Sequence, residues 1–398
     1  MKRYNLRPLA SKRVNAGQRL LQVDDFEHAG EVEHLEEGTV IMLTDQNRQS
    51  NAKAIIGRQN KGIGWIFTHD GDEFWEQELV HSRFESAIKT ARQSFFETEE
   101  TTAFRLFNGE GDGIGGVTVD WYDGFIQINW YSRGIHSYRD WIMAALTDLL
   151  PEIKGVYETK RFKVSADELA IEHTQGETAP QPLVILENGI KYAVYLGEDW
   201  MTGIFFDQRE VRQYIQTQSQ DLTVLNLFSY TGAFSVAAAV GGAAKTVSVD
   251  VANRSNARTK EQFELNGLVP EQPDHEVRVM DVFDYIAYAK RHQLKFDLIV
   301  CDPPSFARTK KYVFKADLDY AKLTRDLFEI TAPGGLCIVS TNHSGYKRED
   351  FQEDMSRVGR EFNNEFHMIQ SFGLPEDFPT SPDVESQYLK VLAFYRQA

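Results

Sequence analysis

Short apolar runs alternate with helix-forming segments through the second half of the chain. The runs are rich in Val, Ile and Leu and have the length of buried strands, at residues 222–228, 245–249, 277–280, 296–301 and 336–340. Between them, helical character is clearest at 233–240 and at 320–331, and we expect the second helix to end at Gly334-Gly335. Strands that alternate with helices predict an α/β fold with a mostly parallel sheet.

Three of these predicted strands are followed by an aspartate, at Asp250, Asp281 and Asp302. The carboxyl ends of parallel strands meet at one edge of a sheet, where open α/β folds bind ligands, so we expect the three carboxylates to converge on one cleft. Pro303 and Pro304 fix the backbone and remove two N–H donors, which leaves nearby carbonyl groups free to accept bonds from a ligand. The sequence therefore predicts an active site at residues 302–306.

The loop after the strand at 222–228 narrows the choice of cofactor. It reads Ser229-Tyr230-Thr231-Gly232, so the G-x-G-x-x-G pattern of dinucleotide-binding proteins is absent. Asp250 follows about twenty residues later, at a position from which an acidic side chain holds ribose hydroxyl groups. These features favour a cofactor that has a ribose but no phosphate.

The first half of the chain has a different pattern. Strand-like segments at 39–43, 52–57 and 63–68 are separated by Gly, Asn and Asp turns and predict a small β-barrel. Residues 75–97 have apolar positions at helical spacing and predict one amphipathic helix. An α+β middle domain is predicted by further strands and a helix, at 104–107, 117–120, 125–130, 137–150 and 156–159, before a polar loop over 165–182. We expect three domains, with bounds 1–72, 73–182 and 183–398.

Charge limits how the chain meets a nucleic acid. The net charge is −16 at pH 7, which argues against binding through general electrostatics, so any RNA contact has to be local. Basic side chains gather near the start of the chain and beside the predicted site, and those expected to contact RNA are Lys2, Arg3, Arg7, Lys12, Arg13, Arg308, Lys310 and Lys311. Two cysteines, no apolar run long enough to span a bilayer and no signal-peptide pattern predict a cytoplasmic protein, and we expect no metal.

Four segments carry a family resemblance, at residues 202–209 (TGIFFDQR), 225–232 (LNLFSYTG), 302–306 (DPPSF) and 388–390 (YLK). They are similar to motifs of the RlmI family of 23S rRNA cytosine methyltransferases, which are class I S-adenosylmethionine-dependent enzymes. The resemblance implies a Rossmann-like methyltransferase domain closed by an antiparallel terminal hairpin, and an RNA-binding PUA domain at the start. It also implies S-adenosylmethionine as cofactor, S-adenosylhomocysteine as product, 23S rRNA as partner and a homodimer.

The same resemblance implies roles for individual residues. The methionine part of the cofactor would lie among residues of the 225–232 segment, with Asp250 at the ribose and Asp281 at the adenine. The residues expected to bind the cofactor are Phe206, Gln208, Arg209, Asn226, Phe228, Ser229, Tyr230, Thr231, Gly232, Asp250, Val251, Asp281, Val282 and Asp302.

The chain departs from the RlmI pattern at the catalytic nucleophile. Methylation of cytosine C5 uses a cysteine thiolate that adds to the base, and the family places this cysteine in an S-C-S-G turn after the fifth strand. This chain has no thiol in the corresponding segment 340–345, which reads STNHSG. Cys301 and Cys337 lie inside predicted strands, where they suit an apolar core.

A second resemblance fits this gap. Residues 302–310 (DPPSFARTK) are similar to a box of RlmK, the guanine-N7 methyltransferase of the same rRNA, whose corresponding turn lacks a cysteine. Guanine N7 is already nucleophilic, and an exocyclic amine needs only acceptors for its N–H groups, so neither target requires a thiolate. We expect catalysis by positioning and electrostatics, with an aromatic ring stacked on an extruded base. The candidate catalytic residues are Asp302, Pro303, Pro304, Phe306 and Asn342.

Three alternatives stay open. One is transfer to cytosine C5 with an unconventional nucleophile. Another is a non-catalytic RNA-binding or ribosome-assembly factor with a vestigial cofactor site, which the intact series of aspartates opposes. The third is a small-molecule methyltransferase, for which two additional domains would be superfluous.

Overall fold

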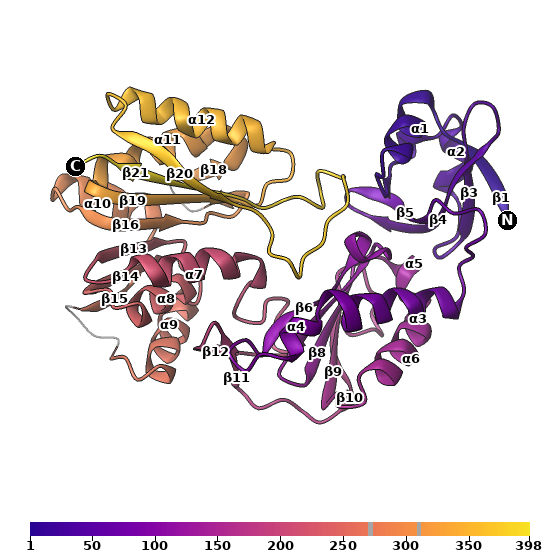
Figure 1. The fold of residues 1–398 in the computed structure, drawn as a ribbon, viewed down its shortest axis with the longest axis horizontal. Coiled ribbons are helices and arrows are strands. Elements are labelled where there is room, and N and C mark those ends of the chain that lie inside the picture. The colour runs from indigo at the N-terminus through magenta and orange to yellow at the C-terminus, as the bar shows by residue number, and fades with distance from the viewer. Residues whose placement is uncertain (270–273, 309–311) are drawn as a thin grey trace. The chain divides into compact units, whose positions relative to one another are not determined.

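The computed structural model describes residues 1–269, 274–308 and 312–398, which form two compact units (Figure 1). The first unit comprises Met1–Ile185, Val194–Thr202 and Glu376–Gln387. The second unit comprises Leu186–Ala193, Gly203–Pro375 and Tyr388–Ala398. A short hairpin of β11 (Leu183–Glu187) and β12 (Ile190–Val194) contributes residues to both units.

A five-stranded sheet of order β1-β3-β4-β5-β2 begins the first unit. Its strands are β1 (Lys2–Asn5), β2 (Leu20–Leu21), β3 (Val40–Thr44), β4 (Ser50–Gln59) and β5 (Gly62–Thr68). The strands predicted at 39–43, 52–57 and 63–68 are therefore confirmed. Three short helices, α1 (Pro8–Asn15), η1 (Val23–Asp25) and α2 (Ala29–Glu33), accompany the sheet, and Val14, Val32 and Ile41 lie in one apolar cluster.

A second sheet, of order β10-β9-β8-β7-β6, completes the first unit. Its strands are β6 (Ala103–Asn108), β7 (Val117–Tyr122), β8 (Phe125–Trp130), β9 (Gly155–Lys160) and β10 (Ile171–Gly176), and its helical segments are η3 (Gly109–Asp112), α5 (Arg133–His136) and α6 (Arg139–Leu149). The predicted α+β pattern is confirmed, but the loop predicted over 165–182 is wrong. Strand β10 pairs with β9 at the sheet edge, where its polar side chains are largely exposed and need no apolar alternation.

The two sheets share an apolar core. Trp65 and Phe67 of β5 lie in one buried cluster with Phe84, Phe104 and Ile128 of the following segment. This common core explains why residues 1–185 form one compact unit, and the predicted division at residue 73 falls inside it.

The single helix predicted over 75–97 is wrong. The chain forms α3 (Gln77–Ser86), then a π-helical turn (Ala87–Ala91), then the short α4 (Gln93–Phe96). The turn precedes Arg92, which is completely buried and donates to both carboxylate oxygens of Asp112 at 2.6 and 2.7 Å and to the carbonyl of Asp377 at 2.9 Å. A π-turn inserts one residue into the helical repeat and rotates the residues after it about the helix axis, which fits the inward direction of this guanidinium.

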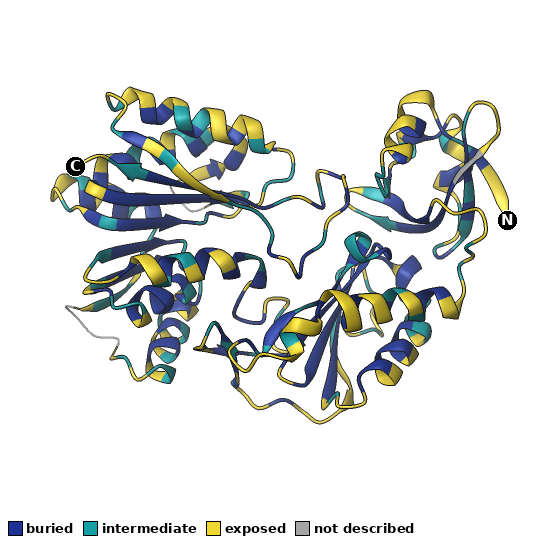
Figure 2. Ribbon diagram, in the orientation of Figure 1, coloured by how far each residue is buried: buried dark blue, intermediate teal, exposed yellow. Residues whose placement is uncertain are grey.

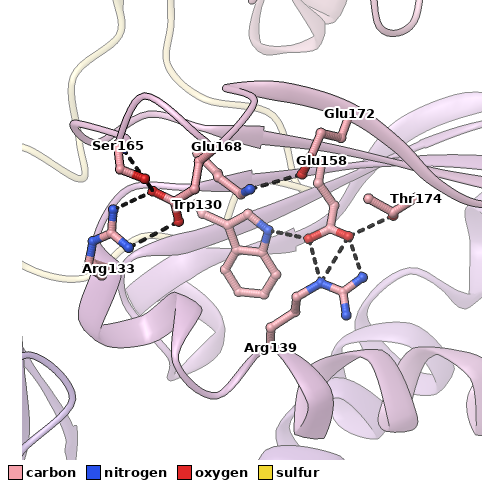
Figure 3. A network of polar contacts seen from close by, with 9 residues as sticks. Trp130, Arg133, Arg139, Glu158, Ser165, Glu168, Glu172 and Thr174 are labelled. Atoms are coloured by element: carbon pink, nitrogen blue, oxygen red, sulfur yellow. Dashed lines mark hydrogen bonds and ion pairs between the residues drawn. The ribbon is translucent and has the colours of Figure 1, made fainter.

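A polar network stabilises the middle of the first unit (Figure 3). Glu158 of β9 is buried and accepts hydrogen bonds from the guanidinium of Arg139, the indole of Trp130 and the hydroxyl of Thr174. Burial by itself raises the pKa of Glu158, but these donors, Arg139 foremost, bring it below the ordinary value. Because the buried carboxylate is fully paired, we interpret the network as structural.

The second unit is built on a seven-stranded sheet of order β15-β14-β13-β16-β19-β21-β20. Its strands are β13 (Thr223–Leu227), β14 (Lys245–Asp250), β15 (His275–Val279), β16 (Phe296–Cys301), β19 (Thr331–Thr341), β20 (Phe366–Phe372) and β21 (Lys390–Arg396). The first five strands of this order pair in parallel, and β21 runs antiparallel to both β19 and β20. The predicted parallel sheet with its antiparallel terminal hairpin is therefore confirmed.

Helices cover both faces of this sheet, so that its central strands are buried and the outer helix surfaces are exposed (Figure 2), while the edge strands β15 and β20 are partly exposed. One face carries α7 (Arg209–Gln218) and α8 (Ala233–Val240), the other carries α10 (Val282–Arg291), α11 (Ala316–Ile330) and α12 (Arg348–Glu361), and α9 (Asn253–Leu265) lies against β15. The predicted helix end at Gly334-Gly335 is wrong, because α11 ends at Ile330 and both glycines lie in β19. No helix of the described residues is long and apolar enough to cross a membrane.

We predict that the second unit depends on the buried ion pair between Glu187 and Arg212. The guanidinium donates to both carboxylate oxygens, at 2.5 and 2.8 Å, and both side chains are almost fully buried. Arg212→Met would leave the buried carboxylate without its bidentate partner and should lower the free energy of unfolding by about 3–5 kcal/mol. Urea unfolding measures this, with Arg325→Met at the exposed Arg325–Glu361 pair as a control expected to change stability far less. Equal losses in the two variants would contradict the prediction.

Candidate active site

The carboxyl ends of neighbouring parallel strands lie along one edge of the second unit's sheet. Asp250 ends β14, Asp281 follows β15 and Asp302 follows β16, in the order that the sequence predicted. Parallel pairing aligns Cys301 with Val339, which makes Asp302 and Ser340 neighbours at the ends of β16 and β19. The strand order thus places the three aspartates along one edge, and their convergence on a common cleft stays a prediction.

Asp302 is held by neutral hydrogen-bond donors. The hydroxyl of Ser340 donates to its Oδ1 at 2.7 Å, and the side-chain amide of Gln208, in η4 (Phe206–Gln208), donates to the Ser340 hydroxyl at 2.8 Å. Burial raises the pKa of Asp302 to about 6, helped by the negative charge of Asp207, while Ser340 and Gln208 act in the opposite direction. A carboxylate that changes charge just below neutral pH is suited to a catalytic site.

The residues after Asp302 form a rigid turn that leads to an exposed aromatic ring. Pro303 is buried and Pro304 is exposed. Phe306 exposes 55% of its surface, and the hydroxyl of Ser305 donates to Oδ1 of Asn342 at 2.6 Å, which ties this turn to the one after β19. The structure therefore brings Asp302, the proline turn and Asn342 together.

Near the predicted basic residues, β17 (Phe306–Arg308) and β18 (Val313–Lys315) pair as antiparallel strands. Arg308 is exposed on β17. Lys310 and Lys311, predicted to contact RNA, lie outside the described residues.

The loop after β13 has a strained backbone. Phe228 and Tyr230 have φ values of +57° and +52°, and Gly232 has +79°. Such values are uncommon for residues with a Cβ atom, and they concentrate at functional sites. At Gly232 a Cβ atom would also lie 2.4 Å from the Cγ2 atom of Thr259, so glycine is required there for packing as well as for conformation.

Hydrogen bonds fix this loop from both sides. The amide of Ser229 donates to the carbonyl of Val249 at 3.0 Å, and the hydroxyl of Thr231 donates to the carbonyl of Gly203 at 2.6 Å. The amide of Tyr230 donates to Oδ2 of Asp250 at 2.9 Å. These contacts hold four of the predicted cofactor-binding residues, Ser229, Tyr230, Thr231 and Asp250.

Other predicted cofactor residues differ in how accessible they are. Val251 is exposed beside Asp250, whereas Val282 is buried in the apolar core. Asp281 caps helix α10 by accepting the amide of Phe283 at 2.9 Å. Val282 is therefore a core residue, while Val251 has the exposure that contact with a ligand needs.

Phe206 and Arg209 are also interior residues. Phe206 is 4% exposed, and the guanidinium of Arg209 lies 3.8 Å from the carboxylate of Glu187. By contrast, two of the predicted cofactor residues have a buried acceptor atom with no hydrogen-bond partner among the described residues, Oε1 of Gln208 and Oδ1 of Asn226. Unsatisfied buried acceptors are costly, which makes them candidates for contact with a ligand's donor groups.

The basic residues near the start of the chain lie in the first unit. Lys2, Arg3, Arg7, Lys12 and Arg13 are all exposed. Arg13 forms an ion pair with Asp25, and the guanidinium of Arg7 donates to the carbonyl of Phe26 at 3.1 Å. Part of their capacity to bind phosphate is thus taken by contacts within the chain.

Three polar residues of the site were not predicted as site residues. Ser340 contacts Asp302 directly, the hydroxyl of Tyr388 donates to Oδ2 of Asp207 at 2.8 Å, and Tyr320 bonds the backbone of Ser340. Ser340 could have been found by aligning the ends of the predicted strands, because it is the last residue of the strand predicted at 336–340 and Asp302 directly follows the strand predicted at 296–301. Tyr320 comes from α11, far from any motif, and gives no such signal.

Both cysteines are confirmed as core residues. Cys301 and Cys337 are free thiols without exposed surface, in the apolar cluster that α10, α11 and α12 cover. Burial raises the pKa of Cys337 to about 12 and that of Cys301 well above its ordinary value. Burial therefore disfavours the thiolate form of both residues, which makes them poorly suited to act as nucleophiles.

Comparison with known proteins identifies the family. Residues 106–395 match the family described as S-adenosylmethionine-dependent methyltransferase, and residues 5–69 match a PUA-like domain. The chain belongs to the S-adenosylmethionine-dependent methyltransferase family. In structure, this methyltransferase is similar to SMU.776, a candidate methyltransferase crystallised with SAH, with TM-score 0.90 and 38% identity over 99% of this chain and 100% of that chain.

Two curated relatives of this methyltransferase carry ribosomal names. It is 44% identical to YwbD of Bacillus subtilis, named as a candidate ribosomal RNA large subunit methyltransferase, over 100% of both chains. It is 30% identical to ribosomal RNA large subunit methyltransferase I of Aeromonas salmonicida, over 82% of this chain and 83% of the relative.

The donor and acceptor groups of the site fit S-adenosylmethionine. The cofactor offers an ammonium group, two ribose hydroxyls and an adenine amine, all of which donate hydrogen bonds. The unpaired Oε1 of Gln208 and the strand-end carboxylates of Asp250 and Asp281 are acceptors. The methyltransferase therefore has the acceptor-rich edge that this cofactor needs.

We predict that the double variant Cys301→Ala, Cys337→Ala keeps methyltransferase activity. Because both thiols are buried and protonated, their removal should lower stability through lost packing and leave the rate constant per folded molecule within about twofold. Transfer of a labelled methyl group, normalised to the folded fraction from urea unfolding, measures this. A loss of activity in fully folded protein would restore a thiol mechanism.

Proposed function

We propose that this methyltransferase modifies a base of large-subunit ribosomal RNA, in line with the 23S rRNA that the sequence predicted. The names of its curated relatives, including one of equal length at 44% identity, support this substrate. The PUA-like domain supports it as well, because a small-molecule methyltransferase has no need of such a domain. A cytoplasmic location follows from a ribosomal substrate.

We infer that the acceptor atom is a base nitrogen, either guanine N7 or an exocyclic amine. One observation carries this inference: both thiols are buried and protonated, while a strand-end carboxylate is anchored at the site. Cytosine C5 would require a nucleophile to activate the ring. A nitrogen carries its own lone pair and needs orientation and electrostatic support only.

S-adenosylmethionine supplies an electrophilic methyl group when bound. The chain's residues have to hold the target nitrogen in line with it and keep the nitrogen lone pair available. In our proposal Asp302 accepts an N–H of the base, the exposed ring of Phe306 stacks on it, and Asn342 adds a further polar contact from the neighbouring turn. Pro303 and Pro304 keep the turn rigid.

Binding of the RNA has to overcome the net charge of −16. We propose local phosphate contacts from the exposed basic residues of the PUA-like domain and from Arg308. For function we keep the predicted division as a proposal, with RNA binding in 1–72, a middle domain in 73–182 and catalysis in 183–398. The homodimer implied by resemblance stays a proposal.

We predict methyl transfer to 23S rRNA that lacks modifications. Incubation with labelled S-adenosylmethionine should place label on one nucleoside, and mass spectrometry of that nucleoside identifies the base and atom. Label on cytosine C5 would overturn the inference of a nitrogen acceptor. Absence of transfer, together with failure to bind S-adenosylhomocysteine in calorimetry, would favour the non-catalytic RNA-binding factor instead.

We predict an acidic limb in the pH dependence of kcat/KM with a midpoint near pH 6. The carboxylate of Asp302 must be ionised to accept an N–H, and its pKa is raised to about 6, so activity should fall as the pH drops below that value. Asp302→Asn should remove the limb and lower the rate on the plateau. Because the pKa of Asp302 is higher in the folded protein than in the unfolded chain, its ionisation lowers the free energy of unfolding as the pH rises from about 4 to 6. Above pH 6, Asp302→Asn should therefore be more stable than the wild type. A wild-type profile that is flat down to pH 5 would contradict the role of Asp302.

A further inference from the structure

A chain of hydrogen bonds links three separate elements to the catalytic carboxylate. Gln208 of η4 donates to the hydroxyl of Ser340 at 2.8 Å, and that hydroxyl donates to Oδ1 of Asp302 at 2.7 Å. Gln208 and Ser340 are 3% and 1% exposed, so water does not compete for these bonds. A hydroxyl has one proton, and because it accepts from Gln208 its proton is directed at Asp302.

The backbone of Ser340 is fixed independently of its side chain. The hydroxyl of Tyr320 donates to the carbonyl of Ser340 at 2.5 Å and accepts from its amide at 3.0 Å. The same oxygen lies 3.3 Å from the carbonyl of Cys301, at the end of the neighbouring strand. Burial keeps the pKa of Tyr320 well above its ordinary value, so the phenol stays protonated and holds both strand ends.

The charged groups around Asp302 do not replace this hydrogen bond. The negative charge of Asp207 of η4 opposes ionisation of Asp302, and Asp207 itself accepts a hydrogen bond from Tyr388. Arg212 of α7 favours ionisation, but its guanidinium is bonded to Glu187. Asp302 forms no ion pair with any described lysine or arginine, so neutral donors have to support its charge.

We propose that Ser340 is a positioning residue for methyl transfer, which orients the Asp302 carboxylate and keeps it ionised at neutral pH, with Gln208 directing its hydroxyl. Because Oδ1 is held by Ser340, the other oxygen, Oδ2, is the one presented to the base. This inference rests on the proposed function, since Ser340 acts through Asp302, which the proposed function makes the catalytic carboxylate. It also gives Gln208 a task besides the cofactor contact predicted from the sequence.

The test is the pH dependence of kcat/KM for Ser340→Ala with rRNA as substrate. Without the Ser340 hydroxyl, the ionised carboxylate of Asp302 loses one hydrogen bond, and the midpoint of the acidic limb should rise by about one pH unit. This shift corresponds to the free energy of one hydrogen bond to a charged group. Ser340→Thr keeps the hydroxyl and should retain a limb close to that of the wild type. Gln208→Leu removes the donor that orients the Ser340 hydroxyl, so it should also shift the acidic limb to higher pH. This variant tests the inference if Ser340→Ala does not fold.

Ser219→Ala is the matched control. Ser219 is a fully buried serine of the same unit, whose hydroxyl donates to the carbonyl of Ile215 at 2.6 Å, away from the strand ends. Its removal should leave the limb in place. An unshifted limb in folded Ser340→Ala would overturn the inference while leaving the proposed function intact, whereas a wild type without transfer at any pH would instead overturn the proposed function.

Discussion

Parallel pairing of β13, β14, β16 and β19 is the constraint on which the site depends. It brings the turns that follow these strands to one edge, although the ends of β13 (Leu227) and β19 (Thr341) are more than a hundred residues apart in sequence. Register matters as much as order, because side chains alternate between the faces of a strand. A slip of one residue between β16 and β19 would turn Ser340 away from Asp302 and move a core residue into its place.

The alternation of side chains between the two faces of a strand also explains why the thiol of Cys301 lies in the core while the carboxylate of Asp302 belongs to the site. Cys301 belongs to the core beneath α10, α11 and α12, while Asp302, the next residue, contacts Ser340 and lies close to η4, which leads into α7. One step along the backbone thus separates an inert apolar environment from a polar one. The loop after β13 adds rigidity, since Phe228 and Tyr230 hold a backbone that costs about 1–2 kcal/mol per residue and that Asp250 and Val249 secure.

Much of this architecture could be predicted because apolar runs of strand length and the aspartates that follow them are local signals. Ser340 also stands at the end of an apolar run, but its contact with Asp302 depends on the register between β16 and β19, which the sequence does not show. The break before Arg92 and the edge strand β10 could not be predicted, because each depends on partners distant in sequence. For the same reason the sequence did not show that Phe206 and Arg209 of the 202–209 motif, and Val282 after Asp281, are interior residues.

The insertion of Glu376–Gln387 into the first unit has a consequence for synthesis of the chain. The carboxylate of Asp383 accepts the backbone amides of Arg19 and Leu20, and Asp377 provides a carbonyl to Arg92 and a carboxylate oxygen to the amide of Arg105. During translation these early residues leave the ribosome long before their partners exist. The first unit therefore reaches its final set of hydrogen bonds only when Glu376–Gln387 has emerged, and neither unit can be transplanted as one continuous stretch of gene.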